Sequence, residues 1–148
     1  MYLSFAQRMN LRPGDVIITP KNIFLKIIEH YLVYLGINQF GQEVYIENDY
    51  RNGVQCITDE HFCFKNPAFK GIRRFTGDET QRYWACERAK SLLSAKYDLA
   101  RFNFENFANY VQYGKSFSIQ VNAANSTFIT WAILNIATTV QKSFNQSL

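Results

Sequence analysis

The sequence predicts an α+β fold, because segments typical of strands fill its first half and segments typical of helices follow. Short runs rich in β-branched and aromatic residues, each bounded by Gly, Pro or Asn, predict strands at 15–19, 31–35 and 43–47. The 148 residues, 47% of them hydrophobic, fit one domain with a sizeable core.

Two further strands are expected in the first half of the chain. Residues 53–58 alternate apolar and polar side chains only in part, which predicts a strand with a weaker pattern. Residues 65–70 predict a loop, because Pro67 would interrupt the hydrogen bonds of a central strand. A short strand is then expected near 71–75.

The first long helix is predicted after Phe75. Residues 76–79 match a capping box, with the hydroxyl of Thr76 at the cap and the carboxylate of Glu79 three residues later. Apolar residues then recur at helical spacing and predict a buried stripe of Ala85, Cys86, Ala89, Leu92 and Leu93. Cys86 is therefore expected in the core.

A second helix is predicted over residues 103–114. Asn103 is the expected N-cap, because its side chain can accept a hydrogen bond from a free backbone N–H of the first turn. Gly114 is the expected residue just past the helix, where a left-handed backbone favours glycine.

The C-terminal segment differs from the rest of the chain, because residues 116–141 carry no charge. Its many Asn, Ser and Thr residues make it a poor bilayer span, which needs roughly 20 mostly apolar residues. Its apolar stripe consists of Ile129, Ile133, Ile136 and Val140. We predict a domain at 1–121 and a hydrophobic helical tail at 122–148 that packs on the domain, on a partner or at a membrane surface.

Charge and cysteine content give coarse information about partners and compartment. The net charge of +4 permits contact with anionic lipid or nucleic acid and identifies neither, so no specific nucleic-acid partner is indicated. Cys56, Cys63 and Cys86 are odd in number and form no Cys-x-x-Cys pair, which favours free thiols in a reducing compartment. The first residues lack a secretory signal pattern, so we expect a cytoplasmic protein. No zinc-ligand spacing is present, and no metal or cofactor is predicted.

The start of the second helix carries a recognisable motif, Asn-Phe-Glu-Asn-Phe at 103–107, and Tyr-Gly closes the helix at 113–114. It resembles the lecithin:retinol acyltransferase-like, or NC-domain, family, which is similar to a permuted papain-like thiol hydrolase. There an Asn-Cys-Glu-His-Phe segment opens a helix that ends in an aromatic-Gly pair. A Cys in the first turn of a helix has its pKa lowered by the N-terminal dipole, but Phe104 has no ionisable group.

Other segments support the same resemblance, which covers about residues 11–121. Residues 11–18 resemble the family's opening Pro-Gly-Asp and strand, and residues 29–36 resemble its histidine box. The resemblance implies that a small antiparallel sheet packs against the helix that starts at Asn103. It also implies that His30 occupies the position of the general base, and that Glu47 or Asn48 orients its imidazole.

The resemblance implies a catalytically inactive domain that binds a lipid, an acyl group or a protein partner, because Phe104 cannot form the covalent intermediate. One alternative is an active thiol acyltransferase or hydrolase with a relocated cysteine, for which Cys63 is a candidate. Another is a structural protein that forms a homo-oligomer through residues 122–141. Family members often carry a hydrophobic C-terminal anchor, which adds peripheral membrane association to the expectations.

Overall fold

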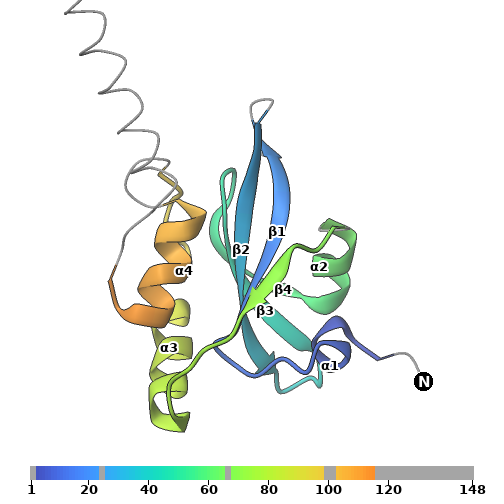
Figure 1. Cartoon of the computed structure of the whole chain (residues 1–148), viewed down its shortest axis with the longest axis vertical. Coiled ribbons are helices and arrows are strands. Elements are labelled where there is room, and N and C mark those ends of the chain that lie inside the picture. The colour runs from blue at the N-terminus through green and yellow to red at the C-terminus, as the bar shows by residue number, and fades with distance from the viewer. Residues whose placement is uncertain (1–2, 24–25, 66–67, 99–102, 116–148) are drawn as a thin grey trace, which may run out of the picture. The chain divides into compact units, whose positions relative to one another are not determined.

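The computed structural model describes residues 3–23, 26–65, 68–98 and 103–115. These ranges contain five strands and four helices, which confirms the α+β class (Figure 1). The chain order is α1 (Phe5–Arg8), β1 (Val16–Ile23), β2 (Lys26–Ile37), β3 (Glu43–Asp49), β4 (Gly53–Thr58), α2 (Asp59–Lys65), β5 (Gly71–Arg73), α3 (Glu79–Ser91) and α4 (Phe104–Tyr113). All of these elements belong to one compact unit, Met1–Phe117.

The strands form one antiparallel sheet in the order β4-β3-β2-β1-β5. The long β2 strand is central, and the pairing of Leu32 with Glu47 sets its register against β3. This register shifts between Tyr34 and Gly36, where Gly36 has a φ of 100° that suits glycine.

Two hydrophobic clusters fill the two sides of the sheet. Neighbouring strand residues alternate between them, as the period of two requires: Val33 and Ile46 join one cluster, and Leu32 and Tyr45 join the other. The first cluster includes Ala85 and Ala89 of α3 and four apolar residues of α4, and the second includes Phe5 of α1 and Phe62 of α2. Figure 1 shows α3 and α4 on one side of the strands and α1 and α2 on the other. The prediction that the sheet packs against the helix starting after Asn103 is confirmed.

The predicted caps of α4 are confirmed. The Asn103 side chain accepts hydrogen bonds from the backbone N–H groups of Glu105 and Asn106, both at 3.0 Å. The side-chain oxygen of Asn106 in turn accepts a hydrogen bond from the Asn103 N–H at 3.2 Å. Gly114 follows the helix with a φ of 69°, so its backbone is left-handed. The two ends of α4 could therefore be predicted from the residues at its caps alone.

The predicted start of α3 is wrong by two residues. Asp78, not Thr76, is the N-cap: its carboxylate accepts from the Gln81 N–H at 2.8 Å, and the Gln81 side chain accepts from the Asp78 N–H at 2.9 Å. Aspartate caps a helix as well as threonine does, so two overlapping patterns competed. The buried stripe is confirmed for Ala85, Cys86 and Ala89, but Leu93 lies beyond the helix end and is 43% exposed.

The first two strands are longer than predicted. Pairing in the β1–β2 hairpin continues through Pro20 and Glu29 to Ile23 and Lys26. Proline is tolerated here because β5 pairs only with Val16–Ile18, so β1 is an edge strand beyond that point. Cross-strand pairing therefore extends a strand past the local sequence signal.

The predicted tail at 122–148 and the domain boundary at 121 lie outside the described residues. In the described part of the chain, no helix combines the length and the apolar character that crossing a bilayer requires.

Candidate functional site

A buried histidine–glutamate pair lies at the centre of the sheet. His30 of β2 and Glu47 of β3 are both 0% exposed, and His30 Nε2 lies 2.7 Å from Glu47 Oε2. The second oxygen of Glu47 accepts a hydrogen bond from Gln55 Nε2 of β4, also at 2.7 Å. Three adjacent strands therefore hold the imidazole in one orientation.

The ring of Phe104 lies against this imidazole. Phe104 is the first residue of α4 and is 2% exposed. Its ring centroid lies 4.6 Å from that of His30, with 81° between the planes, which is an edge-to-face contact. The predicted meeting of His30 and Phe104 is confirmed. That they descend from a base and a nucleophile stays a prediction.

Of the two residues predicted to orient His30, Glu47 is the one placed within hydrogen-bond distance of its imidazole. Asn48 instead donates from Nδ2 to the backbone carbonyl of Asn103 at 3.2 Å, which ties β3 to the cap of α4. Adjacent residues of a strand point to opposite faces, so only one of the two could lie beside the imidazole. Asn48 helps to position Phe104.

The environment of His30 favours its neutral form. Burial lowers its pKa below the ordinary 6.5, and the hydrogen bond to Glu47 opposes this only in part. A carboxylate accepts the Nε2–H, which leaves the lone pair on Nδ1. Nδ1 is buried and has no hydrogen-bond partner among the residues that the structure describes. This is the protonation state of a general base with no proton donor beside it.

The ion pair of Lys21 and Asp49 lies next to the His30–Phe104 contact. Sequence analysis did not predict a role for either residue. Their charged atoms are 2.6 Å apart, and Lys21 Nζ lies 5.5 Å from the Phe104 ring centroid. Gln55 was missed as well. It is the register partner of Glu47 in β4, so extending the strand pairing across the sheet would have found it.

The three cysteines offer no activated thiol. Burial raises the pKa of Cys56, Cys63 and Cys86, and the carboxylate of Asp59 raises that of Cys63 further. Cys63 and Cys86 lie in α2 and α3 but past the first turn of each helix, so neither meets the N-terminal dipole that lowers the pKa of a catalytic cysteine. Cys56 lies in the strand β4.

Asp15 of the Pro-Gly-Asp segment has a structural role. Its buried carboxylate accepts from Arg82 at 3.1 Å, from Arg74 at 2.9 Å and from the Phe75 N–H at 3.0 Å. Burial alone would raise its pKa, but these hydrogen bonds and that of the Arg12 N–H outweigh burial, so the pKa lies below its ordinary value. Asp15 thus joins the start of β1 to α3 and to the segment after β5.

Comparisons with protein-family models, with curated proteins and with solved structures found no match to this chain.

Proposed function

We propose that this chain is a catalytically inactive relative of the lecithin:retinol acyltransferase-like thiol enzymes, and that it acts by binding a lipid, an acyl group or a protein partner. The observation that carries the proposal is the contact of the Phe104 ring with the buried, glutamate-bound imidazole of His30. A thiol at position 104 would lie beside a neutral imidazole and at a helix N-terminus, the two features that activate a cysteine.

The phenyl ring of Phe104 cannot act as a nucleophile, but it still packs between the sheet and α4. It has no lone pair that can attack a carbonyl carbon, so no acyl-enzyme can form at this position. It joins the cluster of buried residues between the sheet and α4 and contacts Tyr97, with ring centroids 4.9 Å apart. The raised pKa values of the three cysteines give the relocated-nucleophile alternative no support.

The proposal extends to location. A chain with three free cysteines suits the reducing cytoplasm. The uncharged sequence at 122–141 suits peripheral contact with a membrane or a homo-oligomer interface.

The test is whether variants that each gain one cysteine are acylated. The wild type, Phe104→Cys and Phe107→Cys are incubated with a small thioester at neutral pH, and covalent adducts are counted by intact mass. Phe107 is the matched control, because it is buried in the same helix one turn later. We expect an adduct on Phe104→Cys at position 104 that disappears when His30→Gln is added, and none on the other two proteins.

Two results would contradict the proposal. An adduct on the wild type that vanishes on replacing Cys56, Cys63 or Cys86 would show an active relocated thiol. Equal reactivity of Phe104→Cys and Phe107→Cys, with both proteins folded by circular dichroism, would show that His30 and the start of α4 are not the remnant of a thiol site.

A further inference from the structure

A small cleft rich in arginine lies between the segment after α1, the segment after β5 and the start of α3. Its volume is about 320 Å³, within the range of small-molecule sites. The described residues that line it are Asn10, Arg12, Asp15, Arg74, Phe75 and Arg82. Three arginines against one aspartate leave this lining with a net charge of +2, which favours an anion as the occupant.

The carboxylate of Asp15 has no acceptor site left for a ligand. It is 1% exposed, and its Oδ1 accepts from Arg82 at 3.1 Å and from the Phe75 N–H at 3.0 Å. Its Oδ2 accepts from Arg74 at 2.9 Å and from the Arg12 N–H at 3.1 Å. A carboxylate has about four lone-pair sites, so these bonds use all of them. What the lining still offers to a ligand is therefore donors.

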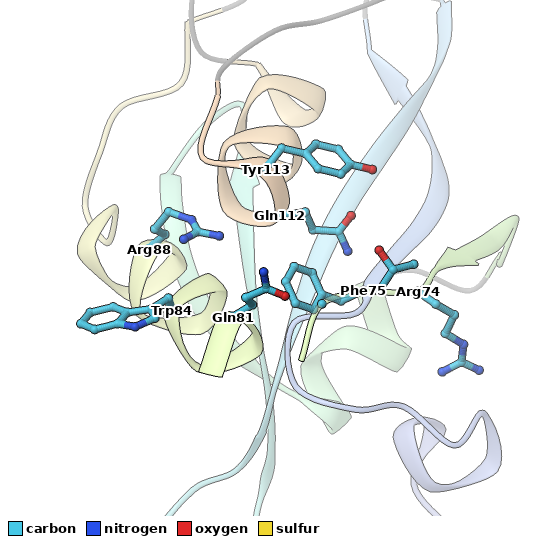
Figure 2. Close-up of a pocket in the computed structure, with 9 residues that line it drawn as sticks. Arg74, Phe75, Gln81, Trp84, Arg88, Gln112 and Tyr113 are labelled. Carbon is cyan, nitrogen blue, oxygen red and sulfur yellow. The ribbon is translucent and has the colours of Figure 1, made fainter. Parts of the chain in front are cut away.

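Arg74 keeps two of its donors available. Its Nη1 donates to the Asn10 carbonyl and to Asp15, and its Nη2 donates to the Met9 carbonyl at 2.7 Å. A guanidinium has five N–H donors, so Nε–H and one Nη2–H have no partner among the residues that the structure describes. The side chain is 48% exposed. Figure 2 shows its guanidinium pointing away from the other labelled side chains, which line a different pocket.

Arg12 is held beside the cleft by its backbone, whereas its side chain makes a weak contact. The Arg12 N–H bond to Asp15 fixes the backbone. In the described part of the chain, the side chain bonds only to Glu79, through Nη2. The two side chains are 56% and 77% exposed, and exposed ion pairs of this kind are weak. Arg12 can therefore exchange Glu79 for a ligand oxygen with little loss.

Arg82 adds buried positive charge at the same cleft. It is 5% exposed, and its Nε is buried without a hydrogen-bond partner among the described residues. A buried cation with an unpaired donor is costly, and an anion nearby stabilises it through its charge. Arg82 thus favours an anion without having to contact it.

We propose that this cleft binds a phosphate group, either as the free anion or as the end of a small molecule. Arg74 holds the phosphate through its two available donors, and Arg12 holds it after its side chain leaves Glu79. A phosphate directs acceptor oxygens to several sides, which suits donors from two separate segments, whereas one guanidinium edge is enough for a carboxylate. The cleft shares no lining residue with the His30–Phe104 contact, so this proposal is independent of the proposed loss of catalysis.

The experiment titrates the full chain at neutral pH and constant ionic strength with inorganic phosphate, phenyl phosphate and acetate. Calorimetry measures the affinity, and ¹⁵N–¹H NMR locates the site. We expect saturable phosphate binding, with the largest backbone amide shifts at residues 10–15 and 74–75, and weaker binding of acetate. Saturation with both phosphates would show that the cleft takes the free anion. Saturation with phenyl phosphate alone would show that it takes a phosphate carried by an organic molecule.

Three variants test the roles of the residues. Arg12→Gln should weaken phosphate binding about tenfold, because it removes charge-assisted hydrogen bonds. Arg51→Gln is the matched control: it removes the same charge from an exposed arginine outside the lining, and it should bind phosphate like the wild type. Glu79→Gln releases Arg12 from its partner, so it should bind phosphate as tightly as the wild type or up to about fivefold more tightly.

Circular dichroism checks that each variant is folded. The proposal is overturned if neither phosphate saturates, if the shifted amides lie elsewhere, or if acetate binds as tightly as phosphate. It is also overturned if folded Arg12→Gln binds like the wild type, if Arg51→Gln loses as much affinity as Arg12→Gln, or if Glu79→Gln binds more weakly than the wild type.

Discussion

The buried histidine should make the stability of this protein depend on pH in a narrow range. Burial lowers the pKa of His30 below 6.5, so as the pH falls below 6.5 the unfolded chain binds a proton that the folded chain does not. The folded state therefore loses stability on acidification, and its full stability is present above the unfolded pKa. The only other histidine, His61, is exposed, so it provides a matched control.

The size of the effect follows from proton linkage. One proton of difference changes the free energy of unfolding by about 1.4 kcal/mol per pH unit, so acidification from 6.5 to 5.0 removes at most about 2 kcal/mol through His30. Asp15 and Glu29, whose pKa values lie below 3.8 and 4.5, lose their stabilising contributions only at lower pH. Between pH 5.0 and 6.5 the histidine term is thus expected to dominate.

Urea denaturation of the full chain at pH 7.5 and pH 5.0 measures this difference. The wild type and His61→Gln should each lose about 1–2 kcal/mol on acidification, whereas His30→Gln should lose less than about 0.5 kcal/mol because its side chain does not titrate. The reasoning is refuted if the wild type is equally stable at the two pH values, or if His30→Gln shows the same loss as the wild type.

Four other perturbations test three separate parts of the structure. In Phe104→Cys, the new thiol should titrate below the ordinary value of about 8.5, measured by the pH dependence of its alkylation rate, and a midpoint at or above that value would show no activation by the helix N-terminus and His30. Asp15→Asn should cost about 3–5 kcal/mol in urea denaturation, because Arg82, only 5% exposed, loses its carboxylate partner. Glu79→Gln, which breaks the exposed pair with Arg12, should cost at most about 1 kcal/mol; equal costs would contradict this account. Truncation after Val121 should change oligomeric state, liposome flotation or melting temperature. Burying the apolar stripe of residues 129–140 is worth several kcal/mol at about 25 cal/mol per Å² of apolar area. If none of the three measurements changes, the tail is dispensable.

Local sequence chemistry was enough to predict the ends of α4 and the positions of the strands. The caps of α4 were readable because Asn103 and Gly114 each satisfy a need of the helix end through their own side chain or backbone freedom. The five strands were located because β-branched and aromatic runs between turn residues need only their immediate neighbours to be recognised. The motif at 103–107 also predicted which helix would approach His30.

The partners of each side chain were decided by tertiary structure. Both Glu47 and Asn48 can accept a hydrogen bond from an imidazole N–H, and the register of β2 against β3, with its shift at Gly36, decided that Glu47 does. The same pairing brought Gln55 to Glu47 across another strand. The hydrogen bonds that join Arg73 to Asn109 and Gln112 became visible only once β5 lay beside α4, because the two partners are more than 35 residues away in the chain. A residue's type sets which bonds it can make, whereas the pairing of distant segments decides which of those bonds form.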